Sequence, residues 1–229
     1  MTPNLNLLNE RGYVIVPNVY STDELNAIEK YIHKVHGDSL GFGERNFLNR
    51  TRGLQELLMT STMKKLLAEV APKSSIVKSL YFDKSPQENW FVSFHRDQTI
   101  FVQEKVEAFG FKNWTERETE FGVQPPAEYS GNIVTVRIHL DDADETNGAL
   151  KVIPYTHSEA TIRPTVFSSF SESDAVLCRV KAGDVMLMKP LLVHASSKSI
   201  AEKNRRVIHL ELCSLDLPEG MEWSQKSPI

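Results

Sequence analysis

The pattern His-x-Asp supplies an imidazole and a carboxylate two residues apart, and this chain contains it three times. The copies are His36-Gly37-Asp38, His95-Arg96-Asp97 and His139-Leu140-Asp141. Residues i and i+2 of a β-strand project from the same face, so both side chains can reach one metal ion. Two histidines and one carboxylate form the ligand set of many non-haem iron sites. Each copy is therefore a candidate part of such a site.

The surroundings of each copy separate the first from the other two. His36 ends a helical segment and is followed by Gly37, so strand geometry is not expected there. His95 closes the apolar segment 90–94, and His139 closes a segment that begins at residue 132. Periodicity alone leaves the choice between His95 and His139 open.

A third ligand would come from a distant histidine. His194 follows a Gly183-Asp184 turn and two short apolar segments, and Arg205 comes eleven residues later. An arginine at that place can hold the far carboxylate of a dicarboxylic cosubstrate through two hydrogen bonds. Considered singly, a strand histidine is more often structural, and an arginine in a turn is more often solvated.

Helical patterns dominate the first third of the chain. Ser21 and Glu24 form a predicted capping box, apolar residues follow at helical spacing, and Gly37 ends the helix. A second helical pattern runs over 54–70 and stops at Ala71-Pro72. Only the segment 12–17 reads as a short strand.

The rest of the chain has the pattern of short strands rich in Val, Ile, Leu and Phe. We expect them at 75–82, 90–95, 132–140, 149–153, 175–180, 185–188, 191–195 and 205–213. This predicts a mainly β protein with flanking helices (α+β), built on a double-stranded β-helix of the jelly-roll or cupin-like kind. We expect one domain over 1–229, with 1–74 as a helical outer layer and 75–215 as the jelly-roll core.

The segment 98–130 interrupts the strand pattern. Its aromatic residues are scattered among charges, two glycines and Pro125-Pro126, so we do not expect it to build a core of its own. It is either a lid over a site or a padded surface loop. We favour a lid, because the segment directly follows His95 and Asp97.

The composition excludes several classes of protein. The 229 residues carry a net charge of −4, with 26 basic against 30 acidic side chains, which provides no general attraction to nucleic acid or anionic lipid. No apolar run approaches the ~20 residues that cross a bilayer. Two cysteines form neither a disulfide framework nor a zinc motif. We expect a cytoplasmic protein, monomeric or a weak homodimer, that acts on a small molecule.

The order of these motifs resembles the phytanoyl-CoA dioxygenase family of Fe(II)- and 2-oxoglutarate-dependent oxygenases. The resemblance runs from the segment 12–17 to the strand after Arg205. The His-x-Asp of the family falls on His95 and Asp97, and its distal histidine falls on His194 after Gly183-Asp184. A family-like stretch, Leu140-Asp141-Asp142 followed by Asn147-Gly148-Ala149-Leu150, assigns His139 to a connecting strand.

The resemblance implies an iron site made by His95, Asp97 and His194, with no other catalytic residue. It implies that 2-oxoglutarate is bound by Arg205 and contacted by Ser196, although a slip of one residue onto Arg206 is possible. The implied reaction uses O2, decarboxylates 2-oxoglutarate to succinate and CO2, and hydroxylates a small-molecule substrate. Hydroxylation is favoured over halogenation because the Asp97 carboxylate fills the position that a halide would need.

Two departures from the family concern the substrate. One is the insertion 98–130, which carries Trp114. The other is Arg137, at a strand position where members often have Trp. If Arg137 faces the barrel interior, it binds an anionic group of the substrate or cosubstrate, or it pairs with a nearby acid and is structural. We name Arg137, Thr135 and Trp114 as candidate substrate residues.

Two other classes of protein remain open. A cupin-like barrel with non-oxidative chemistry would bind a metal without consuming 2-oxoglutarate. A non-catalytic double-sheet binding protein would bind no metal.

Overall fold

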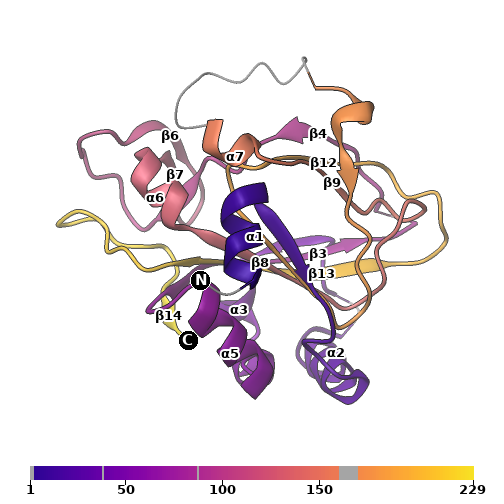
Figure 1. Cartoon of the computed structure of the whole chain (residues 1–229). Coiled ribbons are helices and arrows are strands. Elements are labelled where there is room, and N and C mark those ends of the chain that lie inside the picture. Colours follow the sequence, from indigo (N-terminus) through magenta and orange to yellow (C-terminus); the bar gives the residue numbers. More distant parts are fainter. Residues whose placement is uncertain (1–2, 38, 87, 160–169) are drawn as a thin grey trace.

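The computed structural model describes residues 3–37, 39–86, 88–159 and 170–229. Two β-sheets face each other, and helices cover the outer face of the larger one (Figure 1). This arrangement is a jelly roll with an outer helical layer, so the expected fold is confirmed. Among the described residues, no helix is both long enough and apolar enough to cross a membrane.

The larger sheet has seven strands, and every pairing in it is antiparallel. Its order is β1 (Tyr13–Val16), β11 (Val185–Met188), β8 (Val134–His139), β13 (Arg205–Cys213), β3 (Ser75–Lys84) and β14 (Ser227–Pro228), with β2 (Gly43–Arg45) also paired to β3. The smaller sheet is antiparallel too. Its order is β10 (Val176–Leu177), β9 (Leu150–Ile153), β12 (Val193–Ser196) and β4 (Val92–His95).

Strand β8 is buried on both faces and separates two environments. Val134, Val136 and Ile138 pack into the hydrophobic core beneath the helices, and each is at most 2% exposed. The residues between them project from the opposite face, toward the interior of the barrel. Arg137 lies on that interior face and lines its cavity. The strand therefore places apolar side chains in the core and polar ones at the site.

The helical layer forms largely as its sequence pattern predicts. Helix α2 (Thr22–His36) has the capping box of Ser21 and Glu24, and it ends at Gly37. The other helices of this layer are α1 (Pro3–Arg11), α3 (Phe47–Arg50), α4 (Leu54–Leu58) and α5 (Ser61–Val70). The layer is not purely helical, because β1 and β2 leave it to join the large sheet.

The insertion 98–130 differs from the expectation, because it is folded. It contains β5 (Ile100–Val102), β6 (Lys112–Glu116), β7 (Phe121–Gln124) and the first turn of α6 (Ala127–Asn132), and its strands form a sheet in the order β5-β7-β6. Ile100, Val102 and Val123 are at most 3% exposed and pack with Met221 and Trp223. The periodicity was hidden by a register shift within β6 and by partners supplied from the C-terminal segment.

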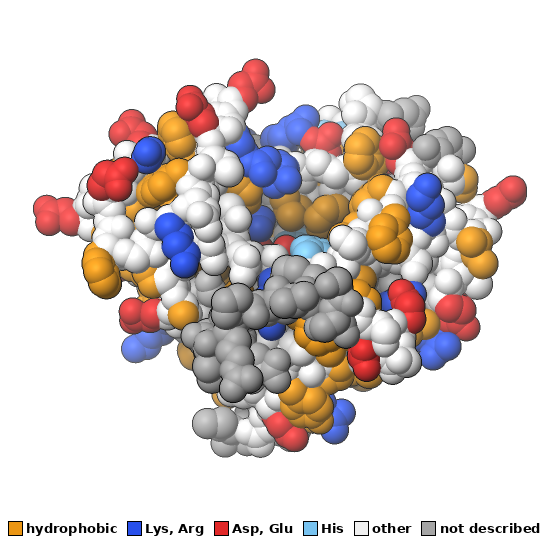
Figure 2. Space-filling model, turned by 90° about the horizontal axis from the view of Figure 1, so that it is seen from above, with side chains coloured by type: hydrophobic (Ala, Val, Ile, Leu, Met, Phe, Trp, Pro, Cys, Tyr) orange, Lys and Arg blue, Asp and Glu red, His pale blue; other side chains and the backbone are white. Residues whose placement is uncertain are grey.

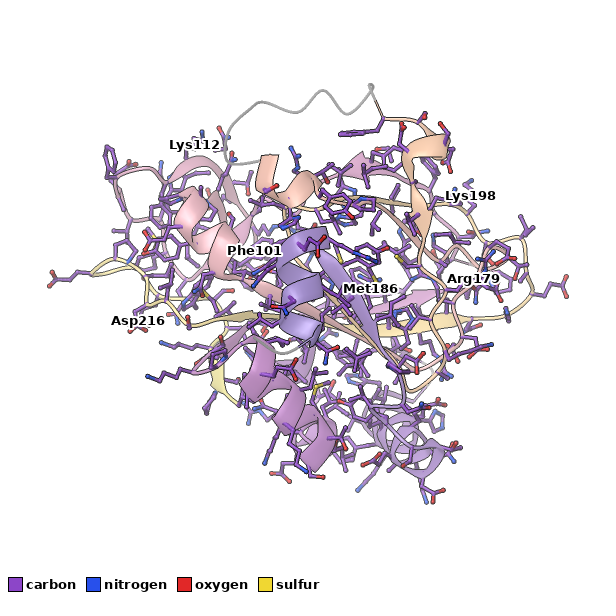
Figure 3. The ribbon with its side chains drawn as sticks, in the orientation of Figure 1. Phe101, Lys112, Arg179, Met186, Lys198 and Asp216 are labelled. Carbon is purple, nitrogen blue, oxygen red and sulfur yellow. The ribbon has the colours of Figure 1, made fainter. Side chains whose placement is uncertain are left out.

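The three-stranded sheet packs at the side of the jelly roll (Figure 1). Phe101 of β5, labelled in Figure 3, lies where the two parts meet, and the Lys78 Nζ of β3 is 5.2 Å from its ring centroid. The remaining short elements are α7 (Thr156–Glu159) and the 3-10 helix η2 (Glu172–Asp174).

Candidate metal centre

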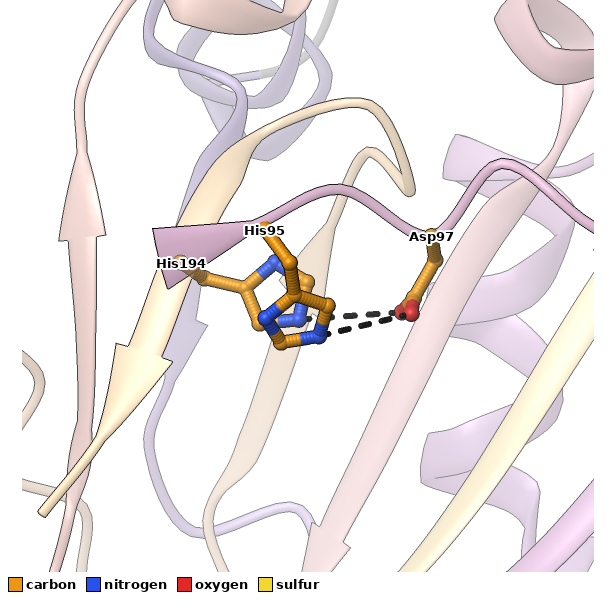
Figure 4. A group of neighbouring side chains, drawn as sticks. All are labelled: His95, Asp97 and His194. Atoms are coloured by element: carbon orange, nitrogen blue, oxygen red, sulfur yellow. Dashed lines mark ion pairs between the residues drawn. The ribbon is translucent and has the colours of Figure 1, made fainter. Parts of the chain in front are cut away.

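Three side chains converge between the two sheets (Figure 4). His95 and His194 face each other across the β4–β12 pair, where they are register partners, and their ring centroids are 4.1 Å apart. Asp97 follows β4 and turns its carboxylate toward both rings. Its Oδ1 lies 3.8 Å from His95 Nε2, and its Oδ2 lies 3.7 Å from His194 Nε2. All three donor atoms fall within 4.8 Å of one another.

Backbone carbonyls fix the orientation of both imidazoles. His95 Nδ1 lies 2.9 Å from the Ser93 carbonyl oxygen, and His194 Nδ1 lies 2.8 Å from that of Leu192. A carbonyl oxygen only accepts, so each Nδ1 carries the proton and each Nε2 keeps its lone pair. The Nε2 to carboxylate distances are too long for hydrogen bonds. The free lone pairs therefore point at the place where a metal would sit.

The charges of the site also match those that a metal requires. Burial acts to raise the pKa of Asp97, but His194, Lys78, His209 and His95 together hold it well below the usual range. Burial lowers the pKa of His194 to about 4, despite the opposing effect of Asp97. At neutral pH the carboxylate is ionised and the His194 imidazole is neutral, as metal ligands must be.

A cavity of about 200 Å³ opens beside the three side chains, and its walls include Phe82, Trp90, Arg137, Arg205 and His209. Figure 2 shows a hollow on this face with histidine and acidic side chains at its floor. This donor set of two imidazole nitrogens and one carboxylate fits an Fe(II) ion. The cavity beside the donors leaves room for further ligands at the open positions of the ion.

Arg205 and Arg206 point in opposite directions, as neighbours on a strand do. Arg205 is 3% exposed and lines the cavity, and its Nε and Nη1 have no partner among the described residues. Arg206 points away from the cavity and forms a bidentate pair with Asp141, at 2.8 and 2.7 Å, and a further contact with Glu29. Of the two arginines, Arg205 is the one that can reach a ligand beside the metal.

Lys84 lies behind the cavity wall, in contact with Ser196, and the sequence reasoning missed it. It ends β3, is fully buried, and donates to Ser196 Oγ at 2.9 Å and to the Ser197 carbonyl at 2.7 Å. Burial, together with Arg205 and Arg137, lowers the pKa of Lys84 to about 7. A lysine at the end of a strand is normally expected to extend to solvent, so no sequence signal identified it.

The role expected for Ser196 is modified by these contacts. Its hydroxyl donates to the Gly148 carbonyl at 2.8 Å, so its proton is not free for a carboxylate, and the residue instead positions Lys84. Gly148 has φ +72°, and a Cβ there would lie 2.4 Å from the Ser197 carbonyl oxygen. This close approach explains why the Asn-Gly turn requires glycine.

The candidate substrate residues separate in the structure. Arg137 lines the cavity and donates from Nη1 to His209 Nδ1 at 3.2 Å. Thr135 lies on the same interior face, fully buried, but does not line the cavity. Trp114 does not lie at the cavity, contrary to the expectation that it contacts the substrate. It lies on β6 and packs with the cluster around Trp223, away from the cavity, because its segment joined a separate sheet.

The competing His-x-Asp pairs do not form metal sites among the described residues. His139 is 2% exposed and its ring nitrogens have no partner, whereas Asp141 is held by Arg206 on the opposite face. His36 ends α2 and contacts Thr51, and Asp38 lies outside the described residues. A second group of possible donors combines Asp97 with His209 and Glu211, and the last two are engaged in other contacts.

The contacts of His209 and Glu211 link these two side chains to Arg137 and Lys78 along the cavity wall. Arg137 can only donate to His209 Nδ1, so His209 Nε2 carries the proton and faces Glu211 Oε1 at 3.4 Å. Glu211 also accepts from Lys78 Nζ at 2.7 Å. Both ring nitrogens of His209 and Oε1 of Glu211 are therefore already engaged.

Comparison with known proteins adds a family match and several similar folds. A family model described as phytanoyl-CoA dioxygenase matches residues 8–207. Phytanoyl-CoA dioxygenase 1 of Oryza sativa subsp. japonica is 23% identical over 166 residues, which cover 68% of this chain and 49% of the relative. The chain thus spans about half the length of that curated relative.

Solved structures with the same fold cover nearly the whole chain. The non-heme alpha ketoglutarate dependent carbocyclase SnoK from nogalamycin biosynthesis has a TM-score of 0.69 at 16% identity, covering 94% of this chain and 85% of its own. HygX from Streptomyces hygroscopicus, with nickel and 2-oxoglutarate bound, has a TM-score of 0.63 at 13% identity, covering 93% and 87%. EctD from S. alaskensis, in its apoform, has a TM-score of 0.68 at 13% identity, covering 93% and 77%.

Proposed function

The chain belongs to the phytanoyl-CoA dioxygenase family, and from this premise we propose that it is an Fe(II)- and 2-oxoglutarate-dependent dioxygenase that hydroxylates a small molecule. One observation carries the proposal: two imidazoles of fixed tautomer and an ionised carboxylate meet at a cavity that also contains a buried arginine without an acidic partner.

His95, Asp97 and His194 would hold the iron, and Arg205 would hold the far carboxylate of 2-oxoglutarate. When bound, the iron with 2-oxoglutarate and O2 supplies an oxidation that converts the cosubstrate to succinate and CO2 and inserts an oxygen atom into the substrate. Lys84 contributes a second donor near Arg205, and its position is held by Ser196. Phe82 and Trp90 form apolar walls that keep water from the reacting groups.

We further propose that the chain acts as one catalytic domain. The C-terminal segment supports this, because β14 pairs with β3 of the large sheet and Trp223 packs beneath the insertion. The insertion 98–130 would then be a structural side sheet rather than a lid, since Ile100, Val102 and Val123 are buried against other protein side chains.

Two measurements test the proposal. Fe(II) binding is measured without oxygen, and succinate formation from 2-oxoglutarate is then measured with and without iron across a panel of metabolites. We expect iron-dependent succinate formation that a substrate stimulates, and its loss in His194→Ala, with Arg206→Gln as a folded control. Metal binding without 2-oxoglutarate turnover would favour the cupin-like alternative. Absence of metal binding in the wild type would favour a non-catalytic binding protein.

A further inference from the structure

Two guanidinium groups line the same cavity, and neither forms an ion pair among the described residues. Arg205 is 3% exposed and Arg137 is 6% exposed. A buried guanidinium without an anion is costly, because nothing compensates the loss of its hydration. Under the proposed function, 2-oxoglutarate brings one distal carboxylate, which is assigned to Arg205. That leaves the charge of Arg137 without a partner.

The contacts of Arg137 do not neutralise it. Its Nη1 donates to the neutral imidazole of His209, its guanidinium lies 5.8 Å from the Phe82 ring centroid, and its Nε has no partner. Burial lowers the pKa of Arg137 to about 10, so the group is still a cation at neutral pH. The sequence left open whether Arg137 pairs with an acid, and within the described residues it does not.

A count of the charges around the cavity also leaves one positive charge without an anionic partner. Lys78, Arg137 and Arg205 line it as cations, Asp97 lines it as an anion, and Glu211 lies behind it in contact with Lys78. Three positive and two negative side chains leave an excess of one. Fe(II) and the dianion of 2-oxoglutarate cancel each other, so the excess persists in the loaded site. Lys84 can only increase this excess of positive charge.

The shape of the surroundings indicates what else the ligand carries. The cavity of about 200 Å³ is smaller than the roughly 300–1,000 Å³ of sites for drug-sized molecules. A second hollow of about 230 Å³ adjoins it and shares the side chains of Leu80, Phe82 and Trp90. Phe42 and Arg45 also line this hollow, and the ring centroid of Phe42 lies 5.4 Å from that of Trp90. An apolar or aromatic body would pack against these rings.

We propose that Arg137 is a specificity-determining residue that binds a carboxylate of the primary substrate, and that this substrate is a small carboxylic acid with an apolar body. The proposal rests on the proposed function, since it assigns Arg205 to 2-oxoglutarate. The carboxylate lies at Arg137, and the apolar body extends along Phe82 and Trp90 toward Phe42. Arginine suits this task because its planar donors match a carboxylate.

The test compares carboxylic acids with the primary amides of the same skeleton. Phenylacetate is paired with phenylacetamide, and hexanoate with hexanamide. Each is titrated into protein loaded with Fe(II) and 2-oxoglutarate in the absence of oxygen, and binding is followed by ligand-observed NMR and by the shift in Tm. In the wild type we expect each acid to bind about tenfold or more tightly than its amide, as a charge-assisted hydrogen bond provides.

The variants Arg137→Gln and Arg137→Lys identify the residue responsible. In Arg137→Gln the preference for the acid disappears, while the affinity for 2-oxoglutarate stays within about threefold of the wild type. Arg206→Gln, which changes an arginine outside the cavity, keeps the preference. Arg137→Lys retains the charge and shows an intermediate preference, which serves as the readout if the glutamine variant does not fold.

Three outcomes would overturn the proposal. Equal binding of acids and amides by the wild type would show that no anionic group is recognised. A preference that survives in Arg137→Gln would assign it to another residue. A loss of 2-oxoglutarate binding in Arg137→Gln as large as in Arg205→Gln would place Arg137 in the cosubstrate site. Failure of the proposed function is distinct, because the wild type would then not bind 2-oxoglutarate with iron at all.

Discussion

Replacing Arg205 by glutamine should separate ligand binding from folding. The side chain is almost fully buried, lines the cavity and has no acidic partner among the described residues. Its neighbour Arg206 provides a matched control, because the same substitution there removes a guanidinium that points away from the cavity and is held by Asp141 and Glu29. The two variants differ by one position in sequence and are expected to have opposite effects.

The expected changes in affinity for 2-oxoglutarate and in stability follow from these contacts. Removing one partner of a buried, charge-assisted pair typically costs about 2–5 kcal/mol of binding free energy, which corresponds to a roughly 30- to 4,000-fold weaker affinity for 2-oxoglutarate. Stability without the ligand should be unchanged or higher in Arg205→Gln, since a buried charge without a partner is removed. In Arg206→Gln the loss of a half-buried bidentate pair should cost about 1–2 kcal/mol, or roughly 2–8 °C in Tm.

Calorimetric titration of 2-oxoglutarate into Fe(II)-loaded protein without oxygen measures the affinity, and thermal unfolding of the ligand-free protein measures the stability. We expect Arg205→Gln to lose affinity and keep its Tm, and Arg206→Gln to keep its affinity and lose Tm. The reverse pattern would mean that Arg206 holds the cosubstrate. Unchanged affinity in both variants would refute the assignment of a cosubstrate arginine.

Three further predictions concern the metal, the pH dependence and the insertion. His95→Ala should abolish anaerobic Fe(II) binding while His139→Ala retains it, as measured by bound iron per protein; the opposite result would move the site to the other His-x-Asp pair. The pKa of Lys84 is lowered to about 7, so its ammonium is charged below that pH and mostly neutral above it. The affinity for 2-oxoglutarate should therefore decrease from pH 6 to 8.5 in the wild type, and Lys84→Met should flatten this dependence in calorimetry; an equally steep profile in the variant would exclude Lys84 as the cause. Amide hydrogens of β5 and β7 should exchange slowly with and without ligands, because Ile100 and Val123 are buried by protein side chains; protection that appears only with ligands would restore the lid.

Much of the fold could be predicted because its signals are local. The capping box of α2 and the strands 185–188 and 205–213 depend on short-range spacing, and the structure reproduces all three. The family could be recognised because four motifs occur in a fixed order, which is far more specific than one His-x-Asp. Thr135 and Arg137 are two residues apart on β8, so strand alternation places them on one face.

The missed features depend on partners that are distant in sequence. Lys84 is buried only because Ser196 and Ser197 meet it from the opposite sheet, and nothing near it in the sequence indicates this. The insertion has a core only because Trp223 and Met221 come from the end of the chain. Trp114 was placed in the site from its closeness in sequence to Asp97, but a register shift and an independent sheet take it elsewhere.

The two faces of β8 have consequences for how this protein could change over evolution. A deletion or insertion of one residue would exchange the faces, so that Arg137 would enter the core beneath the helices and Ile138 would face the cavity. Changes of length in this strand are therefore expected to be lethal to folding. Point substitutions on the interior face leave the contacts of Val136 and Ile138 intact. New substrate preferences can thus arise by single exchanges at positions such as 137, while the scaffold that carries His95, Asp97 and His194 is inherited unaltered.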